Sequence, residues 1–355
     1  MKAAVLGIDG GNSKADVVLV SADGTLLAAL RGRTISHQAI GLKPGMSRLE
    51  SLVRQAAAAA AAADAGGDAL EELKSGASEQ MPVAELAVAS LAGADYLPDI
   101  RLLTNAIEAR GLSRRTVVVN DTIGALRAGA LRPWGVVLVC GQGVNAAAIA
   151  PNGRTARFPA VGDIAGDWGG GGSVGMAGLQ AAIRGRDGRG PRTSLERSVP
   201  AHFGLARPAS VTRAMYDGRI SETRVGELSP VVFAAAQEGD AVARAIVDRL
   251  AAELVGMAAA LIRRLRISSQ DLEVVLAGGV FRADDPEFYA ALERGVRAVA
   301  AQAKLIRLRW PPVVGAALLG LDMLAGGDAG PEVAARLRAS IGAWDREITG
   351  SNGYK

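Results

Sequence analysis

The sequence is poor in several residue types on which common functions depend. Its 355 residues include one cysteine, Cys140, and two histidines, His37 and His202. A single cysteine excludes an internal disulfide, and two distant histidines without a nearby acidic pattern do not form a zinc motif. Aromatic residues make up 4% of the chain, and its 40 basic and 36 acidic residues form no Lys/Arg block. The composition therefore argues against a nucleic-acid partner.

Membrane and export signals are also missing from the sequence. The alanine run at 56–63 is too short to span a bilayer. The N-terminal stretch does not combine a basic segment, an apolar segment and a cleavage site. We therefore expect a cytoplasmic protein with no membrane partner. Its net charge of +4 would suit a small anionic ligand.

Short apolar runs alternate with helix-period segments along the chain, which predicts an α/β fold. A chain of 355 residues that is 49% hydrophobic is long enough for two domains. The expected strands lie at 3–8, 15–20, 86–90, 116–119, 136–139 and 273–277. The expected helices lie at 44–63, 98–110, 122–131, 174–184, 241–265, 286–300 and 313–325.

One arrangement of strands and turns occurs twice. A strand, a glycine turn, a second strand and a hairpin with Asp23-Gly24 form the N-terminus, and the same order, with Asn152-Gly153 in the hairpin, follows from Val136. One such unit per domain predicts domains at 1–120 and 121–325, followed by a tail at 326–355. In this arrangement the two glycine turns face each other across an interdomain cleft.

The first glycine turn carries groups suited to a phosphate site. Glycines let backbone N–H groups approach an anion without obstruction by side chains. An acid beside such a site is explained if a divalent metal lies between the carboxylate and the phosphates. Taken alone, a hairpin of this composition is more often only a tight turn. The turn contains Asp9 as the expected metal ligand, the donors Gly10, Gly11, Asn12 and Ser13, and the cation Lys14.

Three further stretches fit a nucleotide site. The second glycine turn contains Gly141, Gln142, Gly143 and Asn145, and two such turns could clamp one polyphosphate. A buried run places Asn120 and Asp121 at the end of a strand, where ligands of α/β sheets collect. Asp121 is there either a helix N-cap, a catalytic acid, or both. A last strand ends in Gly278-Gly279 ahead of Phe281, which would let a flat base approach the backbone.

As an ordered set, these stretches resemble a known superfamily. "GIDGGNSK", "VVNDTIGAL", "VCGQGVNA", "VLAGGVF" and "PPVVGAALLGL" are similar to motifs of the acetate and sugar kinase, Hsp70 and actin superfamily. Within it, residues 3 to about 325 look like the N-acetylglucosamine kinases and the BadF/BadG/BcrA/BcrD-type ATPases. The resemblance implies two ribonuclease H-like (actin-like ATPase) domains, ATP and Mg²⁺ as cofactors, two phosphate loops, an adenosine loop at Gly278, Gly279 and Phe281, and Asp121 as catalytic base.

The resemblance also implies a sugar site, where the chain departs from the family pattern. Ser36 and His37 fall where the family has an Asn-His segment, and Asp167 matches an acid of the sugar site. Asn120, Asn145 and Trp168 are further expected substrate contacts. Ser36 replaces an asparagine, Trp168 a glutamate, Val161 a tryptophan and Gln142 a threonine. ATP binding is therefore the firmer implication, and the identity of the sugar the weaker.

The resemblance leaves three classes of function open. The expected one is an ATP-dependent kinase for the 6-hydroxyl of an amino sugar such as N-acetylglucosamine, with glucosamine or another hexose as alternatives. The second is an ATPase module that acts on a protein partner. The third is a non-catalytic sugar sensor, against which the intact Asp9, Asp121 and glycine turns argue. A homodimer is compatible with each.

Overall fold

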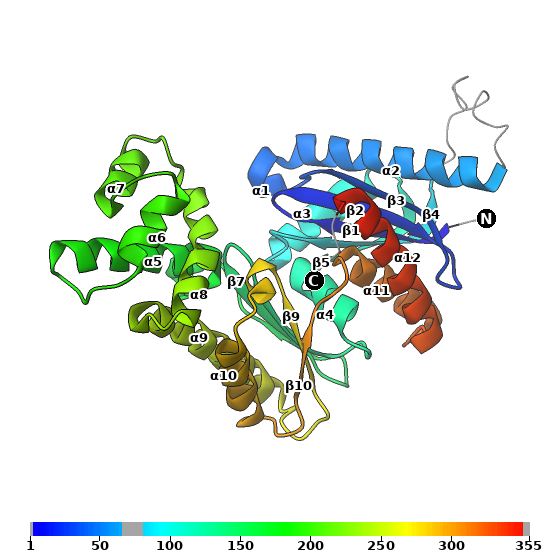
Figure 1. Ribbon diagram of the computed structural model, residues 1–355. Helices are drawn as coiled ribbons and strands as arrows, with labels where there is room; N and C mark the ends of the chain where they lie inside the picture. Colours follow the sequence, from blue (N-terminus) through cyan, green and yellow to red (C-terminus); the bar gives the residue numbers. More distant parts are fainter. Residues whose placement is uncertain (1–2, 66–80, 351–355) are drawn as a thin grey trace. The chain divides into compact units, whose positions relative to one another are not determined.

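A computed structural model describes residues 3–65 and 81–350, which form two compact units. The first unit combines Met1–Gly135 with Leu308–Lys355, and the second is Val136–Arg307 (Figure 1). None of the helices within the described ranges has the length and apolar character needed to cross a membrane.

The first unit contains a five-stranded sheet with helices on both faces. Its strand order is β3-β2-β1-β4-β5, in which β1, β4 and β5 are parallel and β2 is antiparallel to β1 and β3. The strands are β1 (Ala3–Gly10), β2 (Lys14–Val20), β3 (Leu26–Arg33), β4 (Ala84–Leu91) and β5 (Ser113–Asn120). The helices are α1 (His37–Ile40), α2 (Leu42–Ala65), α3 (Leu97–Glu108), α4 (Asp121–Gly129), α11 (Val313–Ala325) and α12 (Pro331–Thr349).

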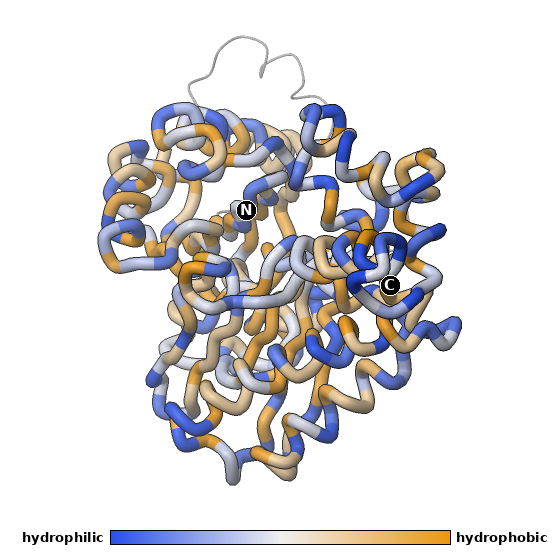
Figure 2. The backbone as a smooth tube through the Cα atoms, turned by 90° about the vertical axis from the view of Figure 1, so that its left-hand side faces the viewer, coloured by the Kyte–Doolittle hydropathy of each residue, from blue (hydrophilic) through white to orange (hydrophobic). Residues whose placement is uncertain are grey.

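Alternation along the strands assigns successive side chains to opposite faces of this sheet. Leu6 and Ile8 pack into the core beneath α2 and α3, whereas Val5 packs into the core beneath α11 and α12. Both faces of β1 are therefore buried, which explains why this strand is almost continuously apolar. In Figure 2 the helices alternate between hydrophobic and hydrophilic residues, as expected for helices with one buried face.

The second unit repeats this sheet order. Its order β8-β7-β6-β9-β10 corresponds strand by strand to β3-β2-β1-β4-β5, and β6, β9 and β10 are parallel. The strands are β6 (Gly135–Cys140), β7 (Val144–Ile149), β8 (Thr155–Arg157), β9 (Glu273–Ala277) and β10 (Lys304–Arg307). The helices are α5 (Gly170–Asp187), α6 (Leu195–His202), α7 (Pro208–Tyr216), α8 (Ser229–Gln237), α9 (Ala241–Leu265) and α10 (Pro286–Arg297), with short 3₁₀ turns at Gly162–Ala165, Glu222–Leu228 and Gly279–Arg282.

The structure confirms the predicted α/β fold and the duplicated arrangement of strands. Gly24 and Gly153 adopt positive φ angles of 83° and 79° in the two predicted hairpins. All seven expected helices are present. Three helices between residues 195 and 237, and α12 in the expected tail, were not predicted.

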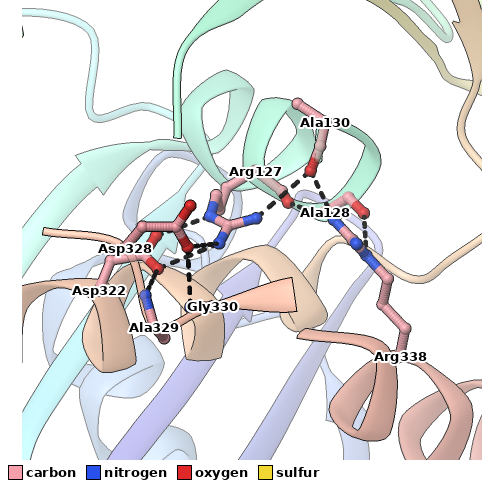
Figure 3. A network of polar contacts seen from close by, with 8 residues as sticks. All are labelled: Arg127, Ala128, Ala130, Asp322, Asp328, Ala329, Gly330 and Arg338. Atoms are coloured by element: carbon pink, nitrogen blue, oxygen red, sulfur yellow. Dashed lines mark hydrogen bonds and ion pairs between the residues drawn. The ribbon is translucent and has the colours of Figure 1, made fainter. Parts of the chain in front are cut away.

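The bounds of the two units differ from the domains expected from the sequence. Helix α4 and the segment from residue 308 onward lie in the first unit. A buried ion pair joins them, because Arg127 Nε of α4 lies 2.6 Å from Asp322 Oδ2 of α11 (Figure 3). The guanidinium of Arg338 in α12 also donates to the carbonyl oxygens of Ala128 and Ala130, at 3.2 and 2.5 Å. The residues after 326 are therefore part of the first unit and hold the C-terminal end of α4.

Candidate active site

In the first unit, the carboxyl ends of three parallel strands place the expected catalytic residues in a row. The register pairs Asp9 of β1 with Ser90 of β4, and Ser90 with Val119 of β5. Asn120 and Asp121 follow directly. Two strand spacings separate β1 from β5, so the backbones of Asp9 and Val119 lie about 10 Å apart. Asp9 and Asp121 are close enough for the charge of Asp121 to raise the pKa of Asp9.

The structure separates the helix cap from the expected catalytic acid. Asn120 is the N-cap of α4, and its side-chain oxygen accepts hydrogen bonds from the Thr122 N–H at 3.2 Å and the Thr122 hydroxyl at 2.5 Å. Asp121 is the first helical residue. The cap that the sequence allowed Asp121 to provide therefore belongs to its neighbour.

Asp9 lies at the end of β1 in an environment that disfavours its charge. Burial raises the pKa of the Asp9 carboxyl to about 7, and the carboxylate of Asp16 adds to the rise, while Lys14 opposes it. Within the described residues, no side chain or backbone N–H donates a hydrogen bond to this carboxylate. A cation at this position would relieve both the desolvation and the repulsion.

The first glycine turn is closed by its own backbone. The Gly11 N–H donates to the Lys14 carbonyl oxygen at 3.0 Å. A Cβ on Gly10 would lie 2.6 Å from Leu91 Cδ2 and 3.0 Å from Ile35, so these side chains would have to shift to admit it. Lys14 Nζ lies 2.7 Å from Asp16 Oδ2. Its ammonium group is thus engaged with an acid that the sequence analysis did not single out.

The expected sugar segment lies beside this turn. The Thr34 hydroxyl donates to the Gly11 carbonyl oxygen at 2.8 Å and accepts from the Ser36 N–H at 3.0 Å. The Ser36 hydroxyl in turn accepts from the Ala39 N–H at 3.3 Å and caps α1. His37 follows in α1, and its ring lies against Gly93, where a Cβ would come within 2.8 Å of it.

A third acid, Asp95, reaches the same row of strand ends. The Asn120 amide donates to Asp95 Oδ1 at 2.9 Å. Asn120 therefore caps α4 with its oxygen and binds Asp95 with its nitrogen. Asp95 was not predicted from the sequence, because a lone acid in the loop after β4 carries no distinguishing pattern.

In the second unit, the second glycine turn borders a cavity of about 530 Å³. The turn is held by the N-terminus of α5, where the N–H groups of Gly171 and Gly172 donate to the carbonyl oxygens of Gly141 and Gln142 at 2.7 and 2.9 Å. A Cβ on Gly141 or Gly143 would meet nothing within 4 Å. The cavity is lined by residues that include Gly141, Gln142, Gly226, Ser229, Phe233, Gln237, Gly279 and Asp284.

This cavity unites two stretches that the sequence analysis assigned to one nucleotide, the turn at 141–143 and Gly279. Gly278 has φ +108°, and a Cβ there would collide with the Cys140 carbonyl group. The side chain of Phe281 does not line the cavity, because it is 3% exposed and packs against Phe288. Its place is the core of the unit, contrary to the expected nucleotide contact.

The remaining wall of the cavity comes from α8 and the turn before it, which the sequence analysis missed. The stretch "GELSPVVFAAAQ" contains small and apolar residues without a charged or glycine-rich motif. The side-chain amide of Gln237 donates to the Asp284 carbonyl oxygen and joins two sides of the cavity.

Two other expected site residues of the second unit have local partners. Asn145 Oδ1 accepts from the Ala146 N–H at 2.7 Å, and Gln142 Nε2 donates to the Thr223 carbonyl oxygen at 3.3 Å.

The thiol of Cys140 is buried, which raises its pKa to about 12 and keeps it protonated at neutral pH.

Asp167 and Trp168 face different surroundings. Oδ2 of Asp167 is buried and, within the described residues, has no hydrogen-bond partner. A buried, unpaired carboxylate oxygen is costly unless a ligand supplies a donor. The Trp168 ring lies 3.9 Å from the guanidinium carbon of Arg249 and lines a groove between α5 and α9. Asp167 is therefore the better candidate for a substrate contact.

The sheet order and the glycine turns define the class of the protein. Two five-stranded sheets of the same order, each with a glycine turn after its first strand, form two domains with the ribonuclease H-like, actin-like ATPase fold. The sequence profile of the BadF/BadG/BcrA/BcrD ATPase family matches residues 6–320, and the chain belongs to this family.

Individual relatives agree with this assignment. The chain is 29% identical over 189 residues to an N-acetylmuramic acid/N-acetylglucosamine kinase of Clostridium acetobutylicum, which covers 53% of this chain and 62% of that protein. It is 24% identical over 321 residues to an N-acetyl-D-glucosamine kinase of Dictyostelium discoideum, covering 89% and 97%. A solved structure from Chromobacterium violaceum, described as a candidate N-acetylglucosamine kinase, superposes with a TM-score of 0.66 at 22% identity, covering 90% and 99%.

Proposed function

We propose that the protein is an ATP-dependent kinase that transfers phosphate to the 6-hydroxyl of an amino sugar, with N-acetylglucosamine as the preferred substrate. The observation that carries this proposal is the position of Asp121, which lies at the carboxyl end of the parallel strands, near enough to Asp9 to raise its pKa, while Asn120 provides the helix cap. The kinases of Clostridium acetobutylicum and Dictyostelium discoideum are named for N-acetylated amino sugars, which supports the substrate class.

The residues present fit ATP and Mg²⁺. The cavity of about 530 Å³ beside Gly141 and Gly279 lies within the usual range for small-molecule sites. The unpaired carboxylate of Asp9, with its pKa near 7, fits a group that binds a cation through water. The described residues contain no cluster of three His, Cys, Asp or Glu side chains, but Mg²⁺ commonly binds one or two carboxylates together with substrate phosphates. When bound, Mg²⁺ would neutralise charge on the phosphate oxygens.

The reaction requires one proton transfer, in which Asp121 would accept the proton of the sugar hydroxyl. Its carboxylate accepts a hydrogen bond from the sugar 6-hydroxyl and orients that oxygen toward the γ-phosphorus. As the new oxygen–phosphorus bond forms and the bond to the bridging oxygen of ADP breaks, the hydroxyl proton moves to Asp121. Backbone N–H groups of the second glycine turn, which borders the cavity, would hold the phosphates in place, and positioning of this kind provides most of the acceleration.

Each unit offers polar groups that suit sugar hydroxyls. The unpaired Oδ2 of Asp167 would accept a hydrogen bond from a sugar hydroxyl. His37, Asp95 and Asn120 gather near the row of strand ends and offer further polar groups. We assign Trp168 to the wall of a neighbouring groove, since its ring stacks with Arg249.

A coupled assay of ADP release tests the proposal. The panel would contain N-acetylglucosamine, glucosamine, N-acetylmannosamine, N-acetylmuramic acid and glucose, with phosphorus NMR to identify the phosphorylated hydroxyl. We expect turnover to depend on sugar and to be highest for N-acetylglucosamine, with phosphate on the 6-hydroxyl. Slow ATP hydrolysis that no sugar stimulates would support the protein-directed ATPase. Sugar binding without turnover would support the sensor.

A further inference from the structure

A further cavity of the second unit shares no lining residue with the proposed nucleotide site. Its volume is about 810 Å³, and it lies between α6, the N-terminus of α9 and the end of α5. Helix α6 lines the cavity of about 810 Å³ and packs on α8, which lines the cavity beside Gly141.

Four arginines line this cavity, and three of them have no partner among the described residues. The guanidinium groups of Arg186, Arg197 and Arg207 make neither a hydrogen bond nor an ion pair within the part of the chain that the structure describes. All three side chains are exposed. Arg192 lies 3.1 Å from Glu196. The arginines outnumber the acidic residues of the lining, which are Glu196 and Asp240.

The two acidic side chains are already engaged. Asp240 accepts hydrogen bonds from the Ser194 N–H and hydroxyl, from the Thr193 hydroxyl and from the N–H groups of Val242 and Ala243. Burial opposes its ionisation, but these hydrogen bonds outweigh it and lower the pKa of Asp240 to about 2. Asp240 therefore stays charged and Glu196 pairs with Arg192, but four arginines against two carboxylates leave the lining with a net positive charge.

Two of these arginines occupy positions that their own helices disfavour. Arg197 lies in the first turn of α6, and Arg207 is the N-cap residue of α7 without a side-chain cap. Positive charge near a helix N-terminus is unfavourable because the helix dipole is positive there. Neither an ion pair nor the helix dipole explains these two residues.

We infer that this cavity is a second binding site, for a small molecule bearing phosphate groups. Guanidinium groups bind phosphate through paired hydrogen bonds and are preferred over ammonium groups for this purpose. A volume of about 810 Å³ accommodates a sugar phosphate or a nucleotide. The ligand bridges Arg186, Arg197 and Arg207 and supplies the negative charge that the lining lacks.

Calorimetric titration with inorganic pyrophosphate in metal-free buffer at 0.15 M salt tests this site. The test variant is Arg197→Gln/Arg207→Gln. The control is Arg213→Gln/Arg219→Gln, which removes the same charge from exposed arginines of the same unit that pair with Asp217 outside the cavity. Binding of pyrophosphate at the glycine turns would be the same in the wild type and in both variants, so it does not affect the comparison of their affinities. Melting temperatures verify that each variant is folded.

We expect the dissociation constant to rise about tenfold for each cavity arginine removed, and therefore about 100-fold in the test variant. The control should stay within about twofold of the wild type. Equal affinity in all three proteins would overturn the inference. Equal weakening in both variants would also overturn it, since only general charge would then be acting. So would binding of a 12-nucleotide RNA without binding of pyrophosphate, which would point to a nucleic-acid surface.

Discussion

Substituting Asp9 with asparagine should stabilise the metal-free protein at alkaline pH. The carboxyl has a pKa of about 7 in the folded state against 3.8 when unperturbed, mainly because of burial. Between these two values the folded state holds a proton that the unfolded state has released. The free energy of unfolding therefore falls as pH rises from about 4 to about 7. Because asparagine does not titrate, the Asp9→Asn protein should not lose this free energy of unfolding as the pH rises.

The size of the effect follows from the shift of about three pKa units. At about 1.4 kcal/mol per unit, the upper bound is about 4 kcal/mol at pH 8. Asp9 is partly exposed, so water screens part of the effect, and we expect about 1–3 kcal/mol. The two proteins should converge near pH 4, where both side chains are neutral.

Urea unfolding in EDTA at pH 4.5 and pH 8 measures this difference. Three of the four tryptophans, Trp134, Trp310 and Trp344, lie in the first unit and report its unfolding. Addition of Mg²⁺ at pH 8 should stabilise the wild type and leave Asp9→Asn unchanged. An Asp9→Asn protein that is less stable than the wild type at pH 8 would refute the reasoning, because the carboxylate would then be stabilised by the fold itself.

Three further substitutions test other parts of the account. Gly141→Ala places a Cβ in open space, so it should keep the melting temperature of the wild type and weaken ATP binding. Gly10→Ala brings a Cβ against Leu91 and should lower the melting temperature. Unchanged ATP affinity in a calorimetric titration of Gly141→Ala would contradict the phosphate-turn assignment. Arg127→Met leaves Asp322 buried without its ion-pair partner and should lower the free energy of unfolding of the first unit, measured by urea unfolding, by about 3–5 kcal/mol. A loss below about 1 kcal/mol would show that the ion pair does not stabilise the packing of α4 on α11.

The sequence predicted the sheets well because their patterns are local. Strands such as Ala3–Gly10 and Gly135–Cys140 are continuous apolar runs that end in glycine turns, and both features are visible in single stretches of sequence. The helices between 195 and 237 were missed because prolines and glycines interrupt their apolar pattern there.

The domain bounds and several side-chain roles could not be predicted, because they depend on contacts between distant residues. The ion pair between Arg127 and Asp322 joins residues 195 positions apart. The cap role of Asn120, the burial of Phe281 and the partner of Lys14 are likewise set by packing. A motif identifies which residue types meet at a site, while the neighbours decide which atoms remain free to bind.

The Asp121→Asn variant tests the central claim most directly. Because Asn120 caps α4, the substitution should leave the melting temperature unchanged while removing the charge that orients and deprotonates the sugar hydroxyl. With N-acetylglucosamine, or the best sugar of the panel, we predict a fall in kcat of roughly 10² to 10⁴ and little change in either KM. A folded Asp121→Asn protein that keeps nearly full kcat would contradict the account, because the proposed kinase would then lack its base.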